Sequence, residues 1–480
     1  MKTFFRLLAV VLLPAAAGAA QPRSVALVVQ DGGLAQISET HDVEPPGADG
    51  LVRIGPLPET LLPASVNAAP AERGEFLDVV AQRFAYDLLD DAALFRAYRG
   101  SAIVCRKGET TLAGRLANLP DFSRAAPSLV LEAEGPAVRI VPDLFALDAI
   151  EFPARADLAR QPTLVWQLAA GQTAPAVVQL HYAAGGLSWS ASHQAILAAD
   201  SRSIALSTRI RLRNDTRRDF VNARIRLALT EKGLYAPLVP DPADARAGQA
   251  PALRYAADGQ SWVPERTAAS AAIVATYDLP QPLTLPAAAE IRASLAALPA
   301  LPVETRYVYD GVRFDRYQRN RRTDWNLGTE FSPVVATRLA FRNESAAALP
   351  PGELRLLRGE ADRNLEWIGT AWLPALKPGE AADLDLGPAA GLSGRRLRTG
   401  YADVEPFKAA EESFEITLQN QTATDQVVDV VEHFYRGDNH QITAASAEHV
   451  PGGDPHSVRF SIPVKAGASQ AFTYTVRYTW

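Results

Sequence analysis

One pattern of apolar and polar positions occurs three times along this chain. Two apolar residues separated by one other residue are followed by an asparagine and, two positions later, by a serine or threonine, at residues 210–216, 339–345 and 416–422. Side chains alternate between the two faces of a strand, so Ile210 and Leu212 face one side of a sheet and the intervening arginines face the other. Asparagine and, more weakly, serine or threonine bond their own backbone, which favours a turn. We therefore predict that each copy is a hairpin of a β-sandwich.

The repeat has two interpretations. Three related sandwich domains would repeat such a sequence, but unrelated sandwiches also reuse the same turn chemistry. The matching segments are short, so the sequence leaves both interpretations open.

Short apolar runs recur elsewhere at the spacing typical of a sandwich or barrel. One helix is predicted in the N-terminal region, because Asp90 or Asp91 can cap it and Leu94, Phe95 and Tyr98 share one of its faces. We predict an all-β fold made of several β-sandwich (Ig-like) domains in tandem, with this one short helix.

The predicted boundaries follow the chain in order. They are a signal peptide at 1–20, an N-terminal β-rich domain at 21–160, a middle β-sandwich block at 161–235, a linker or excursion rich in proline and alanine at 236–304, and a C-terminal β-sandwich domain at 305–480. Proline lacks the donor that a sheet interior needs, which is why residues 236–304 are predicted to lie outside a core.

The first twenty residues have the composition of a secretory signal. Lys2 and Arg6 precede an apolar run at 7–13 and a small-residue cleavage region at 15–20. The expected location is the periplasm or the exterior after cleavage. The single cysteine, Cys105, cannot form a disulfide within the chain.

The net charge and the hydropathy of the chain limit the kinds of partner that the sequence allows. The formal net charge is −6, whereas proteins that bind nucleic acid carry a basic footprint, so we expect no nucleic-acid partner. No stretch after the signal reaches the roughly 18 to 20 apolar residues that a transmembrane helix needs.

A motif near the middle of the chain indicates a family. The segment Gly-Gly-Leu-Ser-Trp-Ser-Ala at 185–191, which contains Gly186, Leu187 and Trp189, follows Leu-His-Tyr at 180–182. With it, the chain resembles exported bacterial proteins that carry the mucoidy-inhibitor-like domain of unknown function 4139. Further segments that match the family pattern lie at 82–89, 98–100, 162–166, 373–386 and 474–480.

The resemblance implies an all-β, multi-sandwich protein of the cell envelope without an established biochemical activity. It supplies no catalytic residues, and the motif residues are expected to be structural. Some relatives carry a long coiled coil that this chain lacks, which puts assembly through a coiled coil in doubt. Trp166 and Trp189 lie in alternating strands and are expected to pack in a core rather than bind a ligand.

Aromatic and basic residues interleave between Tyr307 and Trp325. Guanidinium groups hold carboxylates and aromatic faces stack on sugars, so this segment is the best candidate binding surface, although an exposed strand pair with cross-strand contacts explains the same pattern. The candidate binding residues are Arg313, Arg316, Tyr317, Arg319, Arg321 and Trp325.

A second candidate is a cluster of histidines near the C-terminus. His433, His440, His449 and His456 accompany Glu432, Asp438 and Asp454, and imidazole and carboxylate groups are suitable metal ligands. Their spacing matches no zinc motif, so polar loop residues are the alternative interpretation.

We expect a non-catalytic envelope protein that recognises another protein or a surface polymer, and we expect no cofactor because the chain contains no nucleophile elbow, zinc-protease helix or phosphate loop. One alternative is a metal-assisted hydrolase of an envelope polymer that uses the histidines. Another is an outer-membrane-associated β protein, because residues 472–480 alternate and end on an aromatic residue. The oligomeric state does not follow from the sequence.

Overall fold

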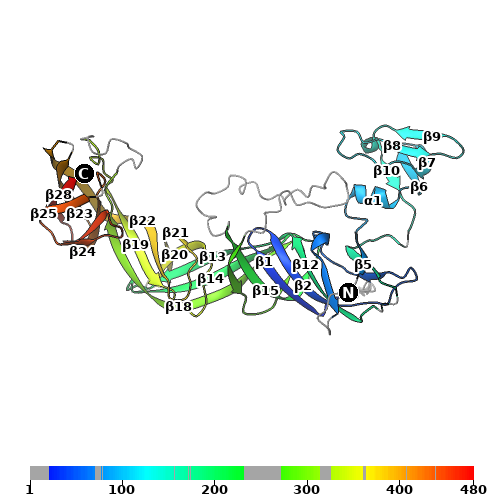
Figure 1. Cartoon of the computed structure of the whole chain (residues 1–480), viewed down its shortest axis with the longest axis horizontal. Helices are drawn as coiled ribbons and strands as arrows, with labels where there is room; N and C mark the ends of the chain where they lie inside the picture. The colour runs from blue at the N-terminus through cyan, green and yellow to red at the C-terminus, as the bar shows by residue number, and fades with distance from the viewer. Residues whose placement is uncertain are drawn as a thin grey trace, which may run out of the picture. The chain divides into compact units, whose positions relative to one another are not determined.

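A computed structural model describes residues 21–70, 77, 79–155, 157–170, 172, 174–231, 272–313, 326–359, 364–406, 408–437 and 439–480. The predicted signal peptide at 1–20 lies outside these residues. Within them the protein is built mostly from strands in several sheets, which confirms the predicted all-β class. Figure 1 shows the strands and the short helix α1 (Asp91–Ala97).

The chain divides into two compact units that interleave along the sequence. The described part of the first comprises residues 21–189, 211–231 and 272–292, and that of the second comprises residues 190–210 and 293–480. The division falls inside three strands, β13 (Leu187–Leu197), β14 (Ser203–Asn214) and β18 (Ala289–Tyr309). The compact units therefore do not follow the linear boundaries predicted from composition.

The main sheet of the first unit begins with a hairpin whose turn contains Gly32 and Gly33. Val25, Leu27 and Val29 alternate into the core from the first strand, and Gly33 takes the positive φ of 89° that the turn requires. The strand order is β16 (Ile273–Asp278), β15 (Phe220–Thr230), β1 (Ser24–Gln30), β2 (Leu34–Asp42), β12 (Val177–Gly185) and β4 (Asn67–Pro70), and β17 (Leu283–Leu285) also pairs with β15.

The same unit contains two smaller sheets. One has the order β10 (Ala149–Glu151), β6 (Ala102–Lys107), β7 (Thr110–Leu116), β8 (Leu129–Glu132) and β9 (Val138–Val141), and the other β3 (Val52–Ile54), β11 (Thr163–Leu168) and β5 (Val79–Ala85). Helix α1 packs Phe95 against the larger of the two, and the Asp90 carboxylate accepts a hydrogen bond from the Ala93 N–H at 2.7 Å. This confirms the predicted helix and its cap.

Two cores lie in the second unit. The strand order is β21 (Leu365–Leu373), β20 (Gly352–Gly359), β13, β14, β18, β19 (Val334–Arg342), β22 (Ala381–Glu405), β23 (Ala409–Asn420), β28 (Ser469–Thr479) and β25 (Asn439–Ala445), with β24 (Gln426–His433), β26 (His449–Pro451) and β27 (Ser457–Val464) joined through β18. Leu206, Leu339 and Leu354 belong to one core, and Phe414, Val430 and Tyr474 belong to the other, which we call the C-terminal core.

Residues 272–304 differ from the linker or excursion predicted for them. They form β16, β17 and most of β18, with Tyr277 and Leu285 buried. Pro280, Pro282 and Pro286 lie in the connections between these strands and therefore interrupt no ladder. The remaining residues of the predicted linker, 236–271, lie outside the described residues.

The asparagine of each repeated pattern is buried and forms the same bonds. The Asn214 Oδ1 accepts hydrogen bonds from the backbone N–H of Thr216 at 3.0 Å and from its hydroxyl at 2.7 Å. Its side-chain amide donates to the Arg218 carbonyl at 2.8 Å and to the Pro286 carbonyl at 2.9 Å. Asn343 repeats this pattern with Ser345, Ala347 and Leu376, and Asn420 repeats it with Thr422, Thr424 and Val464.

These turns are not the hairpins that the sequence predicted. Each connects two strands that are not paired with each other among the described residues: β14 with β15, β19 with β20, and β23 with β24. The buried side-chain amide of each asparagine holds its turn in place by donating hydrogen bonds to backbone carbonyls. The turn therefore does not need backbone hydrogen bonds between the two strands that it connects. The strand after each turn pairs in parallel with an earlier strand: β15 with β1, β20 with β13, and β24 with β18. The three copies thus share a tertiary arrangement as well as a sequence.

Candidate functional site

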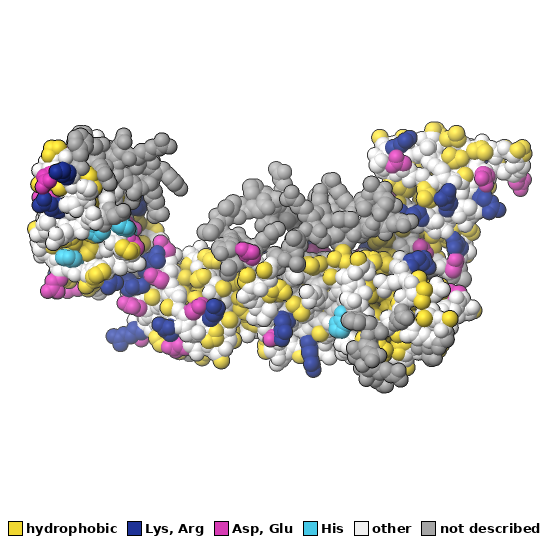
Figure 2. Space-filling model, in the orientation of Figure 1, with side chains coloured by type: hydrophobic (Ala, Val, Ile, Leu, Met, Phe, Trp, Pro, Cys, Tyr) yellow, Lys and Arg dark blue, Asp and Glu magenta, His cyan; other side chains and the backbone are white. Residues whose placement is uncertain are grey.

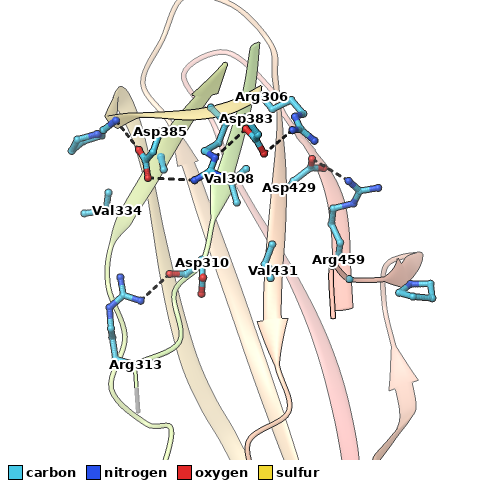
Figure 3. Close-up of a pocket in the computed structure, with 17 residues that line it drawn as sticks. Arg306, Val308, Asp310, Arg313, Val334, Asp383, Asp385, Asp429, Val431 and Arg459 are labelled. Atoms are coloured by element: carbon cyan, nitrogen blue, oxygen red, sulfur yellow. Dashed lines mark hydrogen bonds and ion pairs between the residues drawn. The ribbon is translucent and has the colours of Figure 1, made fainter. Parts of the chain in front are cut away.

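A groove with a volume of about 730 Å³ lies in the second unit, between strands that carry arginine and aspartate side chains (Figure 3). We call it the Arg/Asp groove. Its charged lining residues are Arg306, Arg313, Arg338, Arg459, Asp310, Asp383, Asp385 and Asp429. They come from β18, β19, β22, β24 and β27 and from the segment that follows β18.

One wall places two arginines beside two aspartates. Arg306 and Arg338 are direct cross-strand partners, a position in which like charges repel. Asp383 lies between them, with Oδ2 3.0 Å from Arg306 Nη2 and Oδ1 3.2 Å from Arg338 Nε. Asp385, two positions along β22, lies 3.5 Å from Arg338 Nη1. Because alternate residues of a strand share a face, the Asp-x-Asp spacing puts both carboxylates in the groove.

The opposite wall has a looser pair. Arg459 Nη1 and Asp429 Oδ2 are 4.0 Å apart, and Asp429 Oδ1 also accepts a hydrogen bond from the Ser461 hydroxyl at 2.6 Å. Ser461 is the cross-strand partner of Asp429. Arg459 is therefore only partly neutralised by its own side of the groove.

The third side of the groove is formed by the residues after β18. Arg313 Nη1 donates to the carbonyl oxygens of Asp310 at 3.2 Å and Val312 at 2.9 Å. The Asp310 carboxylate lies 3.2 Å from His433 Nε2, and this hydrogen bond raises the pKa of the histidine. Among the described residues, the Arg313 guanidinium donates hydrogen bonds to backbone carbonyls and is not paired with a carboxylate. Its positive charge is therefore available to a ligand.

Apolar and small residues complete the lining. Val308, Val334 and Val431 lie between the charged groups, and Gly387 and a segment at 451–453 also border the groove. The groove can therefore offer guanidinium donors, carboxylate acceptors and apolar contacts to one ligand. A volume of 300 to 1,000 Å³ is typical of small-molecule sites.

One of the predicted binding residues lies in the part of the chain that the structure describes. Arg313 lines the groove, whereas Arg316, Tyr317, Arg319, Arg321 and Trp325 lie outside the described residues. Tyr309, from the same aromatic stretch, is fully buried in the C-terminal core, and Tyr307 packs against it.

Sequence reasoning missed the five charged groove residues that lie outside the segment 306–325: Arg338, Asp383, Asp385, Asp429 and Arg459. A local signal existed in the Asp-x-Asp pair, since its carboxylates occupy the wet face of a strand whose other face is apolar.

Among the residues that the structure describes, the C-terminal histidines are not gathered into one metal site. The described residues contain no group of three or more histidine, cysteine, aspartate or glutamate side chains placed to hold a metal ion. His433 pairs with Asp310, His440 stacks on Phe434 with ring centroids 4.2 Å apart, and His449 packs against Phe460. His456 lies 5.7 Å from His440 between ring centroids, and Asp438 lies outside the described residues.

Glu432, which the sequence grouped with those histidines, belongs to the core. Its carboxylate pairs with Arg396, with Nε 2.8 Å from Oε2, and accepts a hydrogen bond from the Tyr474 hydroxyl at 2.5 Å. A carboxylate held in this way is not available to a metal at the surface.

The Gly-Gly-Leu-Ser-Trp-Ser-Ala segment at 185–191 has structural roles. Gly186 has a φ of +83° between β12 and β13, and a side chain there would meet Thr216 of the first asparagine turn at 3.2 Å. Leu187 and Trp189 are buried, and the indole N–H of Trp189 donates to the Ala228 carbonyl at 3.2 Å. Trp166 is also buried, so both tryptophans pack in cores as expected.

A search with protein-family models and a search of curated proteins found no match to this chain. In the part of the chain that the structure describes, no helix is long and apolar enough to cross a membrane. Figure 2 shows basic and acidic side chains interspersed over the face in view, rather than gathered by sign.

Proposed function

We propose that this protein is a non-catalytic binding protein of the bacterial cell envelope, and that its Arg/Asp groove binds an acidic saccharide segment of a surface polymer. The observation that carries the proposal is the way in which two arginines of the groove are bonded. Arg313 bonds only backbone carbonyls among the described residues, and Arg459 is 4.0 Å from its carboxylate. Both guanidinium groups can therefore take a carboxylate from a ligand.

The rest of the groove suits the other parts of such a ligand. Sugar hydroxyl groups can donate to Asp385, which is more than half exposed, and Val334 and Val431 offer apolar contact to a ring face. The groove volume of about 730 Å³ fits a few linked rings rather than the surface of a folded protein.

Calorimetry on the mature full-length protein tests the site. We expect oligosaccharides of uronic acid to bind, and their carboxyl-reduced counterparts to bind about tenfold more weakly or not at all. Arg313→Gln and Arg459→Gln should each lower the affinity about tenfold, and binding should weaken with salt. Arg477→Gln is the matched control, because Arg477 lies on β28, 3.8 Å from Glu411, and does not line the groove.

Two results would overturn the proposal. Equal affinity for the acidic and carboxyl-reduced forms would remove the role of the arginines. Shortened oligosaccharides in a mass spectrum after incubation would show hydrolysis and would favour the hydrolase alternative.

The proposed location rests on the N-terminal sequence and on the family resemblance. Lys2, Arg6, the apolar run at 7–13 and the small residues at 15–20 favour export and cleavage. N-terminal sequencing of protein from a periplasmic extract should begin at Ala20 or Gln21. Recovery of uncleaved protein in the cytoplasm alone would contradict this location.

A further inference from the structure

Two tryptophans lie exposed on one short strand of the second unit. On β21, Trp367 is 55% exposed and Trp372 is 40% exposed, although tryptophan is usually one of the more buried residue types. Neither belongs to a core or lines the Arg/Asp groove. Exposed large apolar side chains that occur together mark a surface that binds something.

A β-bulge puts both indoles on the same face. Trp372 faces outward because its neighbours Ala371 and Leu373 pack against the core. Strict alternation from Trp372 would turn residue 367 inward. The register between β20 and β21 shifts at Leu356 and Leu357, which pair with Gly369 and Trp367 and leave Ile368 without a partner position.

Ile368 therefore packs inward beside Gly369, and Trp367 returns to the outer face. Bulges commonly re-aim a side chain in this way. Trp367 and Trp372 lie roughly 13 Å apart along the sheet, because their partners on β20, Leu357 and Glu353, are separated by four residue steps of about 3.3 Å each. That distance exceeds one sugar ring, so a ligand that contacts both must be extended.

The outer face continues across the next two strands in three rows. Trp372 lies opposite Glu353, which lies beside Ser192, and Trp367 lies opposite Leu357, which lies beside Ile196. Between these rows lies a polar one that consists of Thr370, Arg355 and Gln194. Hydrogen-bonding groups thus occupy the space between two exposed aromatic rings.

The two charges in the rows of this face neutralise one another. Arg355 Nε lies 2.6 Å from Glu353 Oε1. The face therefore offers neither net charge nor an unpaired carboxylate to a charged partner. It offers aromatic faces with hydroxyl, amide and guanidinium groups between them, which suits an uncharged ligand rich in hydroxyls.

We propose that the outer face of β20 and β21 is a second binding surface that stacks the sugar rings of an extended neutral glycan on Trp367 and Trp372. The row of Thr370, Arg355 and Gln194 hydrogen-bonds the hydroxyl groups of the rings between them. This surface is independent of the Arg/Asp groove, and its ligand differs from that of the groove in carrying no carboxylate.

Titration of tryptophan fluorescence and calorimetry with neutral hexasaccharides of glucose and of N-acetylglucosamine test the proposal on the mature full-length protein. We expect binding of at least one hexasaccharide and much weaker binding of the matching disaccharide, which is too short to reach both rings. Trp367→Ala and Trp372→Ala should each weaken binding roughly fivefold to tenfold. Phe145→Ala, which removes an aromatic side chain that is also exposed but lies in the first unit, should leave the affinity unchanged.

The double variant Arg313→Gln/Arg459→Gln separates the two proposals, since it should leave binding of the neutral hexasaccharide intact. Melting temperatures of both tryptophan variants should match that of the unaltered protein, because the side chains are exposed. Failure of the unaltered protein to bind any of these hexasaccharides, or equal affinity in the tryptophan variants, would overturn the proposal. So would loss of self-association in the tryptophan variants without any change in glycan affinity, because the face would then bind a second copy of the chain.

Discussion

Arg396 and Glu432 form an ion pair inside the C-terminal core, with Nε 2.8 Å from Oε2 and both side chains almost completely excluded from solvent. Arg396 also donates to the Gly328 carbonyl at 2.5 Å and lies over the Phe414 ring, 3.8 Å from its centroid. A second buried pair, Arg436 with Glu412, lies in the same sandwich at 2.8 Å. Burial of a charge is tolerated here because each charge has a partner.

Removal of one member of that pair should destabilise the protein strongly. Arg396→Met leaves Glu432 buried without its cation, and we expect a loss of about 3–5 kcal/mol in the free energy of unfolding. The double variant Arg396→Met/Glu432→Leu should recover much of the loss, because no unpaired charge remains. Chemical denaturation measures both.

The exposed pair of Lys465 and Asp425 is the control, and Lys465→Met should leave the unfolding free energy almost unchanged. Equal effects of Arg396→Met and Lys465→Met would contradict the assignment of a buried pair.

His193 should make stability depend on pH. Burial lowers the pKa of its imidazole from 6.5 to about 4, and its two ring nitrogens lie 3.0 Å from the Thr208 hydroxyl and from the Pro350 carbonyl. The unfolded chain therefore binds a proton below pH 6.5 that the folded chain does not bind until about pH 4, so stability falls as the pH is lowered through this window.

A pKa shift of this size changes the free energy of unfolding by up to about 3 kcal/mol between those pH values. Denaturation of His193→Gln at several pH values should show a shallower fall than the unaltered protein over the same window. An identical pH profile in the variant would show that His193 titrates normally.

The side-chain amides of the repeated asparagines should contribute more to the free energy of unfolding than an ordinary surface hydrogen bond does. Asn420 is buried and bonds two carbonyls and two groups of Thr422, so Asn420→Ala should destabilise by about 1–3 kcal/mol. Asn420→Asp should be at least as harmful, since it turns a donor into an acceptor that faces the carbonyls of Thr424 and Val464. Thermal unfolding measures the loss.

For comparison, Asn67 makes an exposed contact with the Ser65 carbonyl, and Asn67→Ala should have little effect. A tolerated Asn420→Ala would show that the backbone alone specifies the turn between β23 and β24.

The last strand should be essential to the C-terminal core. Phe472, Tyr474, Val476 and Tyr478 are buried, as their alternation predicts, and β28 lies between β23 and β25. Deletion from Phe472 onward removes several kcal/mol of burial, an amount comparable to the 5 to 15 kcal/mol net stability of a domain.

We expect no soluble folded product from that deletion, whereas Thr479→Lys, at an exposed position, should be tolerated. Solubility after expression and a melting curve check both variants. A truncated protein with an unchanged melting profile would contradict a structural role for β28.

Local sequence determined part of the secondary structure and the faces of several strands. Alternation placed Phe472, Tyr474 and Tyr478 inside, the turn at Gly33 and the cap at Asp90 followed from backbone chemistry, and the short helix followed from its apolar face. These properties depend on residues a few positions apart, so their physical cause is present in the sequence itself.

Only the tertiary structure decided which strands meet. The asparagine pattern predicted three turns, but whether a turn joins two paired strands or two strands that are not paired with each other depends on distant carbonyls, such as those of Leu376 and Val464. The Arg/Asp groove likewise needs Arg338, Asp383 and Arg459 from three strands brought together by pairing. Trp367 faces outward because of a bulge in its register with β20. Strand pairing is a long-range choice, made by the burial of whole faces and by hydrogen bonds between segments far apart in the chain, and no local pattern of residues specifies it.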